Sequence, residues 1–305
     1  MQGRTLPVKL WAAYMTAVRS VAIINSILNG IMNPRQPNRK SFSTRRNVYD
    51  APELYQMAYS YRNIKAEVSA LIRWFKKNSG ARKTPAAVLE LASGPADHAI
   101  EFAKRGISAT ALDISQTMCR FARRQARQRS VSLKTVNEDM IGFSLKHRYD
   151  LVITMIDSIN QIHAAKDMIK HLRSVAACLA ENGLYVIELA KHEKEGEQLQ
   201  DMQWSVRRQN KKLRVVWRPL TARANGKSYK VSLELTADTE RGRLQLADVL
   251  NVRTWSPKDI ERLVKKSGCF RIAARYANFR EDVRPSDREA INCILMLRKL
   301  PNVSN

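Results

Sequence analysis

Glycine, proline and cysteine are scarce in this chain of 305 residues, which contains 11, 10 and 4 of them. So few glycines and prolines argue against a long disordered linker. The four cysteines are widely spaced and form no C-x-x-C pair, which excludes a local zinc knuckle and a disulfide scaffold. No uninterrupted run of about 20 apolar residues occurs, so no membrane-spanning helix is predicted. The composition is that of a globular protein with a sizeable core.

Acidic residues are absent from residues 1–49, although lysine and arginine recur there. Apolar residues spaced by three and four over about 7–32 predict an amphipathic basic helix. We interpret residues 1–47 as a basic arm with two alternative roles. It is either a transit peptide, which directs the chain to the mitochondrial matrix or another organelle, or an RNA-binding extension of a cytoplasmic protein.

The whole chain is strongly basic, with 53 lysines and arginines against 28 aspartates and glutamates and a formal net charge of +25. Such an excess favours contact with RNA or a ribosomal particle, although a protein that is basic throughout has the same composition. The candidate phosphate contacts are three basic runs at 73–83, 123–129 and 207–214.

From Tyr49 onward, apolar segments with strand character alternate with segments of helical spacing. The alternation predicts an α/β fold with a doubly wound, mostly parallel sheet. We expect one long helix over about 52–78. The other predicted elements are strands near 86–92, 108–114, 132–136, 149–156 and 183–189, and helices near 98–105, 115–129 and 165–179.

After Lys191 the pattern changes to β-forming segments between 203 and 254, which predict an antiparallel cap or insertion. Ser256, with Asp259 three residues later, then marks the start of a helix. Closing strands are expected at 270–279 and 291–297. We therefore predict one domain over 48–299, with the cap at 200–254 and a short tail at 300–305.

Ligands of open α/β sheets bind beyond the carboxyl ends of the strands, so the residues that end each strand are candidates. Gly94 lets the backbone turn sharply after the first strand. Asp113 ends the second strand about 20 residues later, the spacing expected of a ribose acceptor. Asp139 and Met140 follow the third strand, and Met155 the fourth.

Each of these residues also has a structural interpretation when it is considered singly. Glu90 and Asp113 are compatible with caps of the helices that follow them, and Met140 is compatible with the core. Their spacing, rather than any single residue, indicates a nucleotide site.

The segment 88–106, VLELASGPADHAIEFAKRG, resembles motif I of class I S-adenosylmethionine-dependent methyltransferases. The segment 111–118, ALDISQTM, resembles their second motif, and 149–153 and 179–188 are similar to their fourth and fifth strands. The similarity spans about Val48 to Lys299. The first and third glycines of the family motif are Ala92 and Ala96 in this chain.

The resemblance implies a class I methyltransferase fold and S-adenosyl-L-methionine as the cofactor. Gly94 is then expected beside the methionine part of the cofactor, with Arg62 on its carboxylate and Asp113 on its ribose. Tyr49 or Tyr61 is expected over the sulfonium, because a ring face attracts a cation. The complete predicted cofactor set is Tyr49, Tyr61, Arg62, Glu90, Ala92, Ser93, Gly94, Pro95, Asp113, Ile114, Met118, Asp139, Met140 and Met155.

The predicted function is methyl transfer to an unidentified acceptor, with a small molecule favoured. Asp157 and His163 are the candidate catalytic residues and Ser158 and Asn160 the candidate substrate contacts. His163 is a potential base, and its alternative role is that of a solvated loop residue. The rival hypothesis is an RNA-binding or ribosome-assembly factor with this fold, with RNA as its substrate or with little activity.

Overall fold

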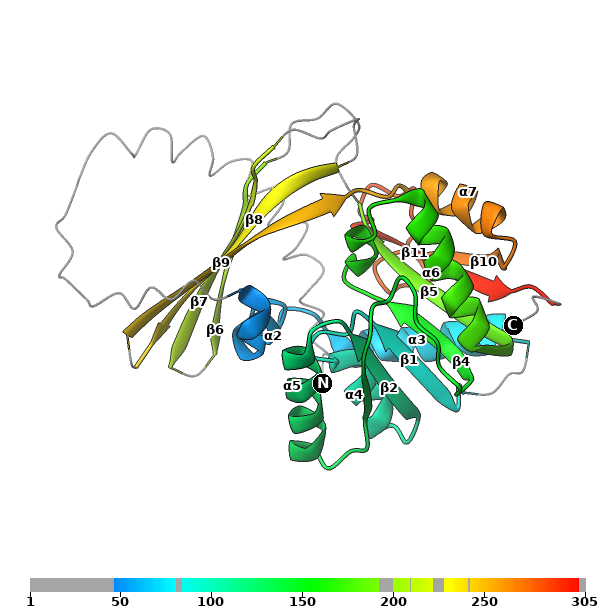
Figure 1. Ribbon diagram of the computed structural model, residues 1–305, viewed down its shortest axis with the longest axis horizontal. Helices are drawn as coiled ribbons and strands as arrows, with labels where there is room; N and C mark the ends of the chain where they lie inside the picture. The colour runs from blue at the N-terminus through cyan, green and yellow to red at the C-terminus, as the bar shows by residue number, and fades with distance from the viewer. Residues whose placement is uncertain are drawn as a thin grey trace.

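Figure 1 shows the computed structural model, which describes residues 47–80, 84–191, 200–208, 210–221, 228–240 and 242–301. The predicted basic helix and almost all of the N-terminal arm lie outside the described residues, as do the last four residues of the tail. No helix within the described ranges is long and apolar enough to cross a membrane.

The main domain is built on a seven-stranded sheet with the order β10-β11-β5-β4-β1-β2-β3. Strands β5, β4, β1, β2 and β3 run parallel to one another. Strand β11 is antiparallel to both β5 and β10. The predicted α/β fold is confirmed. The strands are β1 (Ala87–Leu91), β2 (Ser108–Asp113), β3 (Lys134–Asn137), β4 (Tyr149–Thr154), β5 (Leu179–Ala190), β10 (Phe270–Tyr276) and β11 (Asn292–Lys299).

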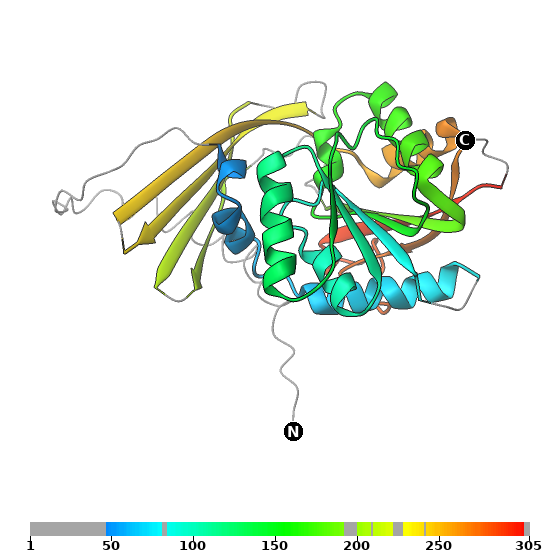
Figure 2. The ribbon, with the colours of Figure 1, turned by 60° about the horizontal axis from the view of Figure 1, so that its bottom comes forward.

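Helices cover both faces of this sheet, so its central strands are apolar on both sides (Figures 1 and 2). Alternate side chains of β1 enter the two cores: Val88 packs on one face and Leu89 on the other. The helices on the Val88 face are α3 (Ile64–Asn78), α4 (Asp97–Lys104) and α5 (Gln116–Gln128), and those on the Leu89 face are α6 (Ala165–Cys178) and α7 (Pro257–Ser267).

The predicted antiparallel region forms a separate four-stranded sheet with the order β6-β7-β8-β9. Its strands are β6 (Met202–Arg208), β7 (Lys211–Pro219), β8 (Ser228–Thr239) and β9 (Gly242–Arg253). One face of this sheet packs against η1 (Val48–Asp50) and α2 (Pro52–Ala58). The indole N–H of Trp204 donates to the carbonyl of Ala58 at 2.8 Å, and Figure 2 shows α2 between the sheet and the main domain.

The single long helix expected over 52–78 is wrong, because the structure has two helices, α2 and α3, with a break at residues 59–63. The apolar spacing continues across the break and hides it. Asn63 caps α3, because its side chain accepts from the backbone N–H of Ala66 at 3.2 Å. The break allows Arg62 to turn into the core of the main domain.

Candidate functional site

A tight turn joins β1 to α4 at the carboxyl edge of the sheet. The backbone N–H of Ser93 donates to the carbonyl of Leu112 at 3.0 Å, which ties the turn to the neighbouring strand β2. The N–H of Gly94 donates to a carboxylate oxygen of Asp113 at 2.7 Å. The structure therefore brings together the two residues that the sequence singled out, Gly94 and Asp113.

Three alternate residues of this turn have left-handed backbones: φ is +47° at Ala92, +51° at Gly94 and +61° at Ala96. These are the positions of the three glycines in the family motif. The chain thus keeps the glycine conformation at the two alanines, at a cost of about 1–2 kcal/mol each. The shape of the turn survives the loss of two glycines.

Replacing Ala92 with glycine is expected to stabilise the protein by about 0.5–1 kcal/mol. Relief of the left-handed strain exceeds the extra entropy that glycine gives the unfolded chain. The matched control is Ala103→Gly in the right-handed helix α4, which should destabilise the protein by about 1 kcal/mol. Urea unfolding of both variants measures the two effects, and a loss of stability in Ala92→Gly would contradict this account of the turn.

Asp113 is buried, with only 8% of its surface exposed. Burial raises the pKa of its carboxyl group, and the N–H groups of Ser115, at 2.8 Å, and Gly94 oppose this rise. Each carboxylate oxygen accepts one of these two bonds. A carboxylate offers about four acceptor positions, so both oxygens can still accept a ribose hydroxyl.

The surface beside Asp113 suits an adenine ring. Ile114 is 71% exposed, an unusual state for a large apolar side chain. Asp139 is exposed, and one of its carboxylate oxygens accepts from the N–H of Ile141 at 2.8 Å. Met118 and Met140, two members of the predicted cofactor set, are buried in the core, so the structure gives their side chains little surface for a ligand.

Aromatic rings from η1 and α2 cover the turn. The ring of Tyr55 lies where a side chain at position 94 would meet it, at 3.7 Å from the Cβ position. Tyr49 and Tyr59 flank Tyr55, with ring centroids 5.5 Å and 4.9 Å away. Tyr61 is 45% exposed and lies 6.4 Å from the ring of Tyr59. Sequence reasoning missed Tyr55 as a residue of the site, because its spacing from Tyr49 gives only a weak helical signal.

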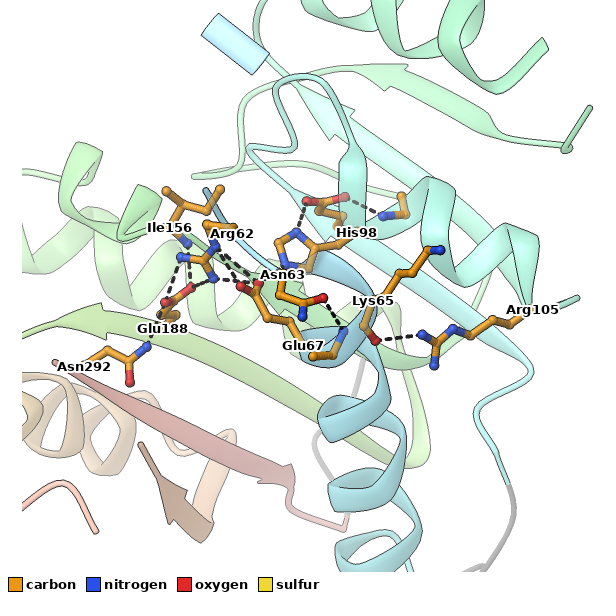
Figure 3. Close-up of polar contacts among 12 residues, drawn as sticks. Arg62, Asn63, Lys65, Glu67, His98, Arg105, Ile156, Glu188 and Asn292 are labelled. Carbon is orange, nitrogen blue, oxygen red and sulfur yellow. Dashed lines mark hydrogen bonds and ion pairs between the residues drawn. The ribbon is translucent and has the colours of Figure 1, made fainter. Parts of the chain in front are cut away.

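A buried ionic network lies beneath the turn, and the sequence did not predict it (Figure 3). Glu90 accepts from the N–H of Ala99 at 2.8 Å, so it does cap α4, and it also faces Nδ1 of His98 at 3.3 Å. Nε2 of His98 contacts Glu67 at 2.8 Å, and Glu67 pairs with Arg62 at 2.8 Å. The network thereby joins β1, α4 and α3.

The same network continues to strands β5 and β11 of the sheet (Figure 3). Two N–H groups of Arg62 donate to the carboxylate oxygens of Glu188 at 3.0 and 2.9 Å. Glu188 also accepts from the N–H of Ile156 at 2.9 Å and from the side chain of Asn292 at 2.9 Å. Buried charges of this kind need such partners to be tolerated.

Arg62 was predicted to hold the methionine carboxylate of the cofactor. Its Nε and both N–H groups of Nη2 contact Glu67 and Glu188, and Nη1 donates once to Glu188. A guanidinium has five N–H donors, so one donor remains for a carboxylate. The role of Arg62 in cofactor binding stays a prediction.

The network fixes the protonation of its histidine. Burial alone would lower the pKa of His98, but hydrogen bonds to Glu67 and Glu90 and the charges of both raise it to about 10. Burial likewise opposes the ionised form of Glu67, but Arg62 and His98 lower its pKa to about 2. His98 is therefore an imidazolium at neutral pH.

Stability should fall as the pH rises from about 6.5 to 10. An unfolded histidine has a pKa of about 6.5, below the folded value, so the contribution of His98 is complete below pH 6.5 and is lost towards pH 10. Folding lowers the pKa of Glu67, so the pH dependence has the opposite direction. The contribution of Glu67 to stability is complete above its ordinary pKa of 4.5 and is lost as the pH falls towards 2. The free energy of unfolding at pH 6 and pH 9 measures the alkaline slope. His98→Gln should flatten it, and an unchanged slope would contradict the assignment.

Ile156 and Asp157 follow the carboxyl end of β4, and both have left-handed backbones, with φ of +54° and +57°. The carboxylate of Asp157 accepts from Asn160 at 2.6 Å and from the N–H of Ala190 at 3.1 Å. These bonds fix the start of η2 (Ser158–Gln161) against the end of β5. Met155 is buried beneath this segment.

His163, the candidate base, is exposed and its Nε2 lies 2.9 Å from the carbonyl oxygen of Asn251 in β9. Arg253 of the same strand donates to the carbonyl of His163 at 2.7 Å. These contacts attach the four-stranded sheet to the main domain. A catalytic role for His163 or Asp157 stays a prediction.

A cavity of about 360 Å³ lies between α3 and α4, where Arg62, Lys65 and Asp97 line it. Neither Gly94 nor Asp113 contributes to it. The cofactor site predicted from the sequence lies at the strand ends instead, where the turn and the carboxylate of Asp113 are found, and it stays a prediction.

Residues 88–183 match the family model for a methyltransferase domain. The curated relative "Putative methyltransferase YqeM" of Bacillus subtilis (strain 168) is 22% identical over 218 residues, which are 70% of this chain and 85% of that protein. The fold is similar to that of an S-adenosylmethionine-dependent methyltransferase from Clostridium acetobutylicum, with a TM-score of 0.67 and 17% identity over 84% of this chain and 100% of that one.

The fold is also similar to CalS10, an amino pentose methyltransferase from Micromonospora echinaspora whose structure has S-adenosylmethionine bound. The TM-score is 0.61, and the identity is 17% over 86% of this chain and 100% of that one. The matched family model covers the turn, Asp113 and the strand ends described above. Residues 88–183 thus match a methyltransferase domain, and the fold of the chain is similar to that of these S-adenosylmethionine-dependent methyltransferases.

Proposed function

We propose that this enzyme transfers a methyl group to a small molecule bound between the main domain and the four-stranded sheet. The observation that carries the proposal is the place of Tyr49. Its side chain packs against the apolar cluster of the four-stranded sheet, and its ring lies 5.5 Å from the ring of Tyr55, which covers Gly94. Tyr49 therefore lies between the turn and the four-stranded sheet.

The face of the sheet that packs towards η1 and α2 is apolar, and its partly exposed side chains Trp204, Leu244 and Leu250 suit an organic acceptor. It carries Trp204, Leu213, Val215 and Leu235, together with the tyrosines of the N-terminal segment. The similarity to CalS10, an amino pentose methyltransferase, supports a small-molecule acceptor. Figure 2 shows the curved four-stranded sheet next to α2 (dark blue), on the side of the main domain away from the C-terminus.

S-adenosylmethionine supplies an electrophilic methyl group when it is bound. Asp113 would hold the ribose, and the left-handed turn at Gly94 allows close approach of the backbone. The ionic network orients Arg62, and the tyrosine rings exclude water from the turn. Catalysis then consists mainly of positioning the acceptor in line with the methyl group.

Isothermal titration with S-adenosylmethionine and its demethylated product S-adenosylhomocysteine tests the proposal. We expect both to bind the full chain with one site. No heat of binding at near-millimolar donor would overturn the enzyme hypothesis and leave a scaffold function.

A second candidate function, RNA binding, is favoured by one observation. Helix α5 exposes Arg120, Arg123, Arg124 and Arg127, of which Arg124 pairs with Glu53. Exposed arginines on one helix suit phosphate contacts. RNA binding that weakens steeply with added salt would support this function, and salt-independent or absent binding would contradict it.

A further inference from the structure

The inner face of the four-stranded sheet, the face towards η1 and α2, carries one acid in its centre. On β9 the side chains of Leu244, Leu246 and Leu250 pack on this face. Successive residues of a strand alternate between faces, so Asp248 points the same way as these leucines. Its partner across the strands is Leu233 of β8, another residue of the same apolar cluster.

Asp248 lacks an ion-pair partner among the residues that the structure describes. One of its carboxylate oxygens accepts from the N–H of Val249 at 2.9 Å. By contrast, Asp238 on the neighbouring strand pairs with Arg243 at 3.1 Å on the exposed face. A carboxylate among apolar side chains costs free energy unless a cation pairs with it.

The carboxylate of Asp248 is half-buried, so a ligand can reach it. Strand β9 contacts η1, and the ring of Tyr49 in η1 packs against the same apolar cluster. Tyr49 in turn lies beside Tyr55, whose ring covers Gly94. An acceptor between the sheet and the turn would therefore have Asp248 on one side and the methyl donor on the other.

We propose that Asp248 is a specificity-determining residue that binds the ammonium form of the acceptor, and that the acceptors are small-molecule amines, which lose one proton to water before the neutral nitrogen takes the methyl group and S-adenosylhomocysteine leaves. This inference rests on the proposed function. A carboxylate pairs with an ammonium group through a charge-assisted hydrogen bond, and a neutral alcohol of the same shape gains much less. The apolar cluster around Asp248 would pack against the carbon skeleton of the amine.

The test uses the full chain saturated with S-adenosylhomocysteine and two matched pairs of probes. These are cyclohexylamine with cyclohexanol, and glucosamine with glucose, and calorimetry measures each affinity. We expect the wild type to prefer each amine over its neutral partner by about tenfold or more. Asp248→Asn, which keeps the shape and removes the charge, should abolish the preference.

The matched control is Asp238→Asn, which removes an exposed carboxylate from the same sheet and should keep the preference. Asp248→Leu is a second variant, which suits the apolar face and should also lose the preference. The absence of an amine preference in the wild type, or its persistence in both Asp248 variants, would overturn the inference.

The affinity for S-adenosylhomocysteine separates this inference from the proposed function. It should stay within about twofold in every variant, because Asp248 does not touch the turn. A wild type that fails to bind S-adenosylhomocysteine would refute the proposed function itself. A wild type that binds it but does not prefer amines would refute only the role of Asp248.

Discussion

Replacing Arg62 with methionine is expected to lower the free energy of unfolding by about 3–5 kcal/mol. The guanidinium pairs with Glu67 at 2.8 Å and with Glu188 at 2.9 Å, and all three side chains are nearly covered. Methionine fills much of the same volume but leaves Glu188 without a cation and Glu67 with only His98 as its cationic partner. An uncompensated buried charge, rather than the lost attraction itself, causes most of the loss.

The matched control is Arg243→Met, because Arg243 pairs with Asp238 on the surface, where both side chains are about half exposed. Exposed pairs contribute about 0–1 kcal/mol, so this variant should unfold almost like the wild type. Urea unfolding at pH 7 compares the two variants. A loss below about 1 kcal/mol for Arg62→Met would show that the network does not stabilise the fold.

Replacing Asp113 with alanine is expected to weaken the binding of S-adenosylmethionine by at least about a hundredfold. Two hydrogen bonds from ribose hydroxyls to a carboxylate contribute about 1.5–3 kcal/mol each, and each 1.4 kcal/mol corresponds to about tenfold in affinity. The variant also releases the N–H of Gly94, so the turn keeps the bond from Ser93 to Leu112 but loses a second bond to β2. Isothermal titration measures the dissociation constant.

Asp150 provides a control at the opposite edge of the sheet. One of its carboxylate oxygens accepts from the backbone N–H groups of Ala86 at 2.7 Å and Ala87 at 3.0 Å. Asp150→Ala therefore also removes an aspartate that holds two backbone N–H groups, but far from the turn. It should bind the donor like the wild type. Equal donor affinity in the Asp113 and Asp150 variants would refute the ribose role of Asp113.

The part of the site that sequence predicts is the part that depends on local spacing. Gly94 and Asp113 each follow a strand, and the parallel order of β1 and β2 places them together. The backbone conformation of Ala92 and Ala96 could not be predicted from the sequence, because alanine disfavours the left-handed region that both residues adopt. The surrounding strands and α4 impose it.

The ionic network was missed because its members come from distant segments. A sequence signal was nevertheless present: Glu90 and Glu188 lie inside buried apolar strands, and Glu67 lies on the apolar face of α3. Acids in such places require buried partners. Which cations pair with them depends on the tertiary fold, in particular on the break that turns Arg62 inward.

The position of β11 in the sheet has a consequence for synthesis. This strand lies between β5 and β10, yet the ribosome makes it after both of them and after the whole four-stranded sheet. Until Asn292 emerges, Glu188 lacks one of its partners and residues 184–190 of β5 form an open strand edge. Open strand edges pair readily with other chains. The nascent protein therefore carries this exposed edge until β11 is made, and nonsense or frameshift mutations upstream of β11 would release chains held in that state.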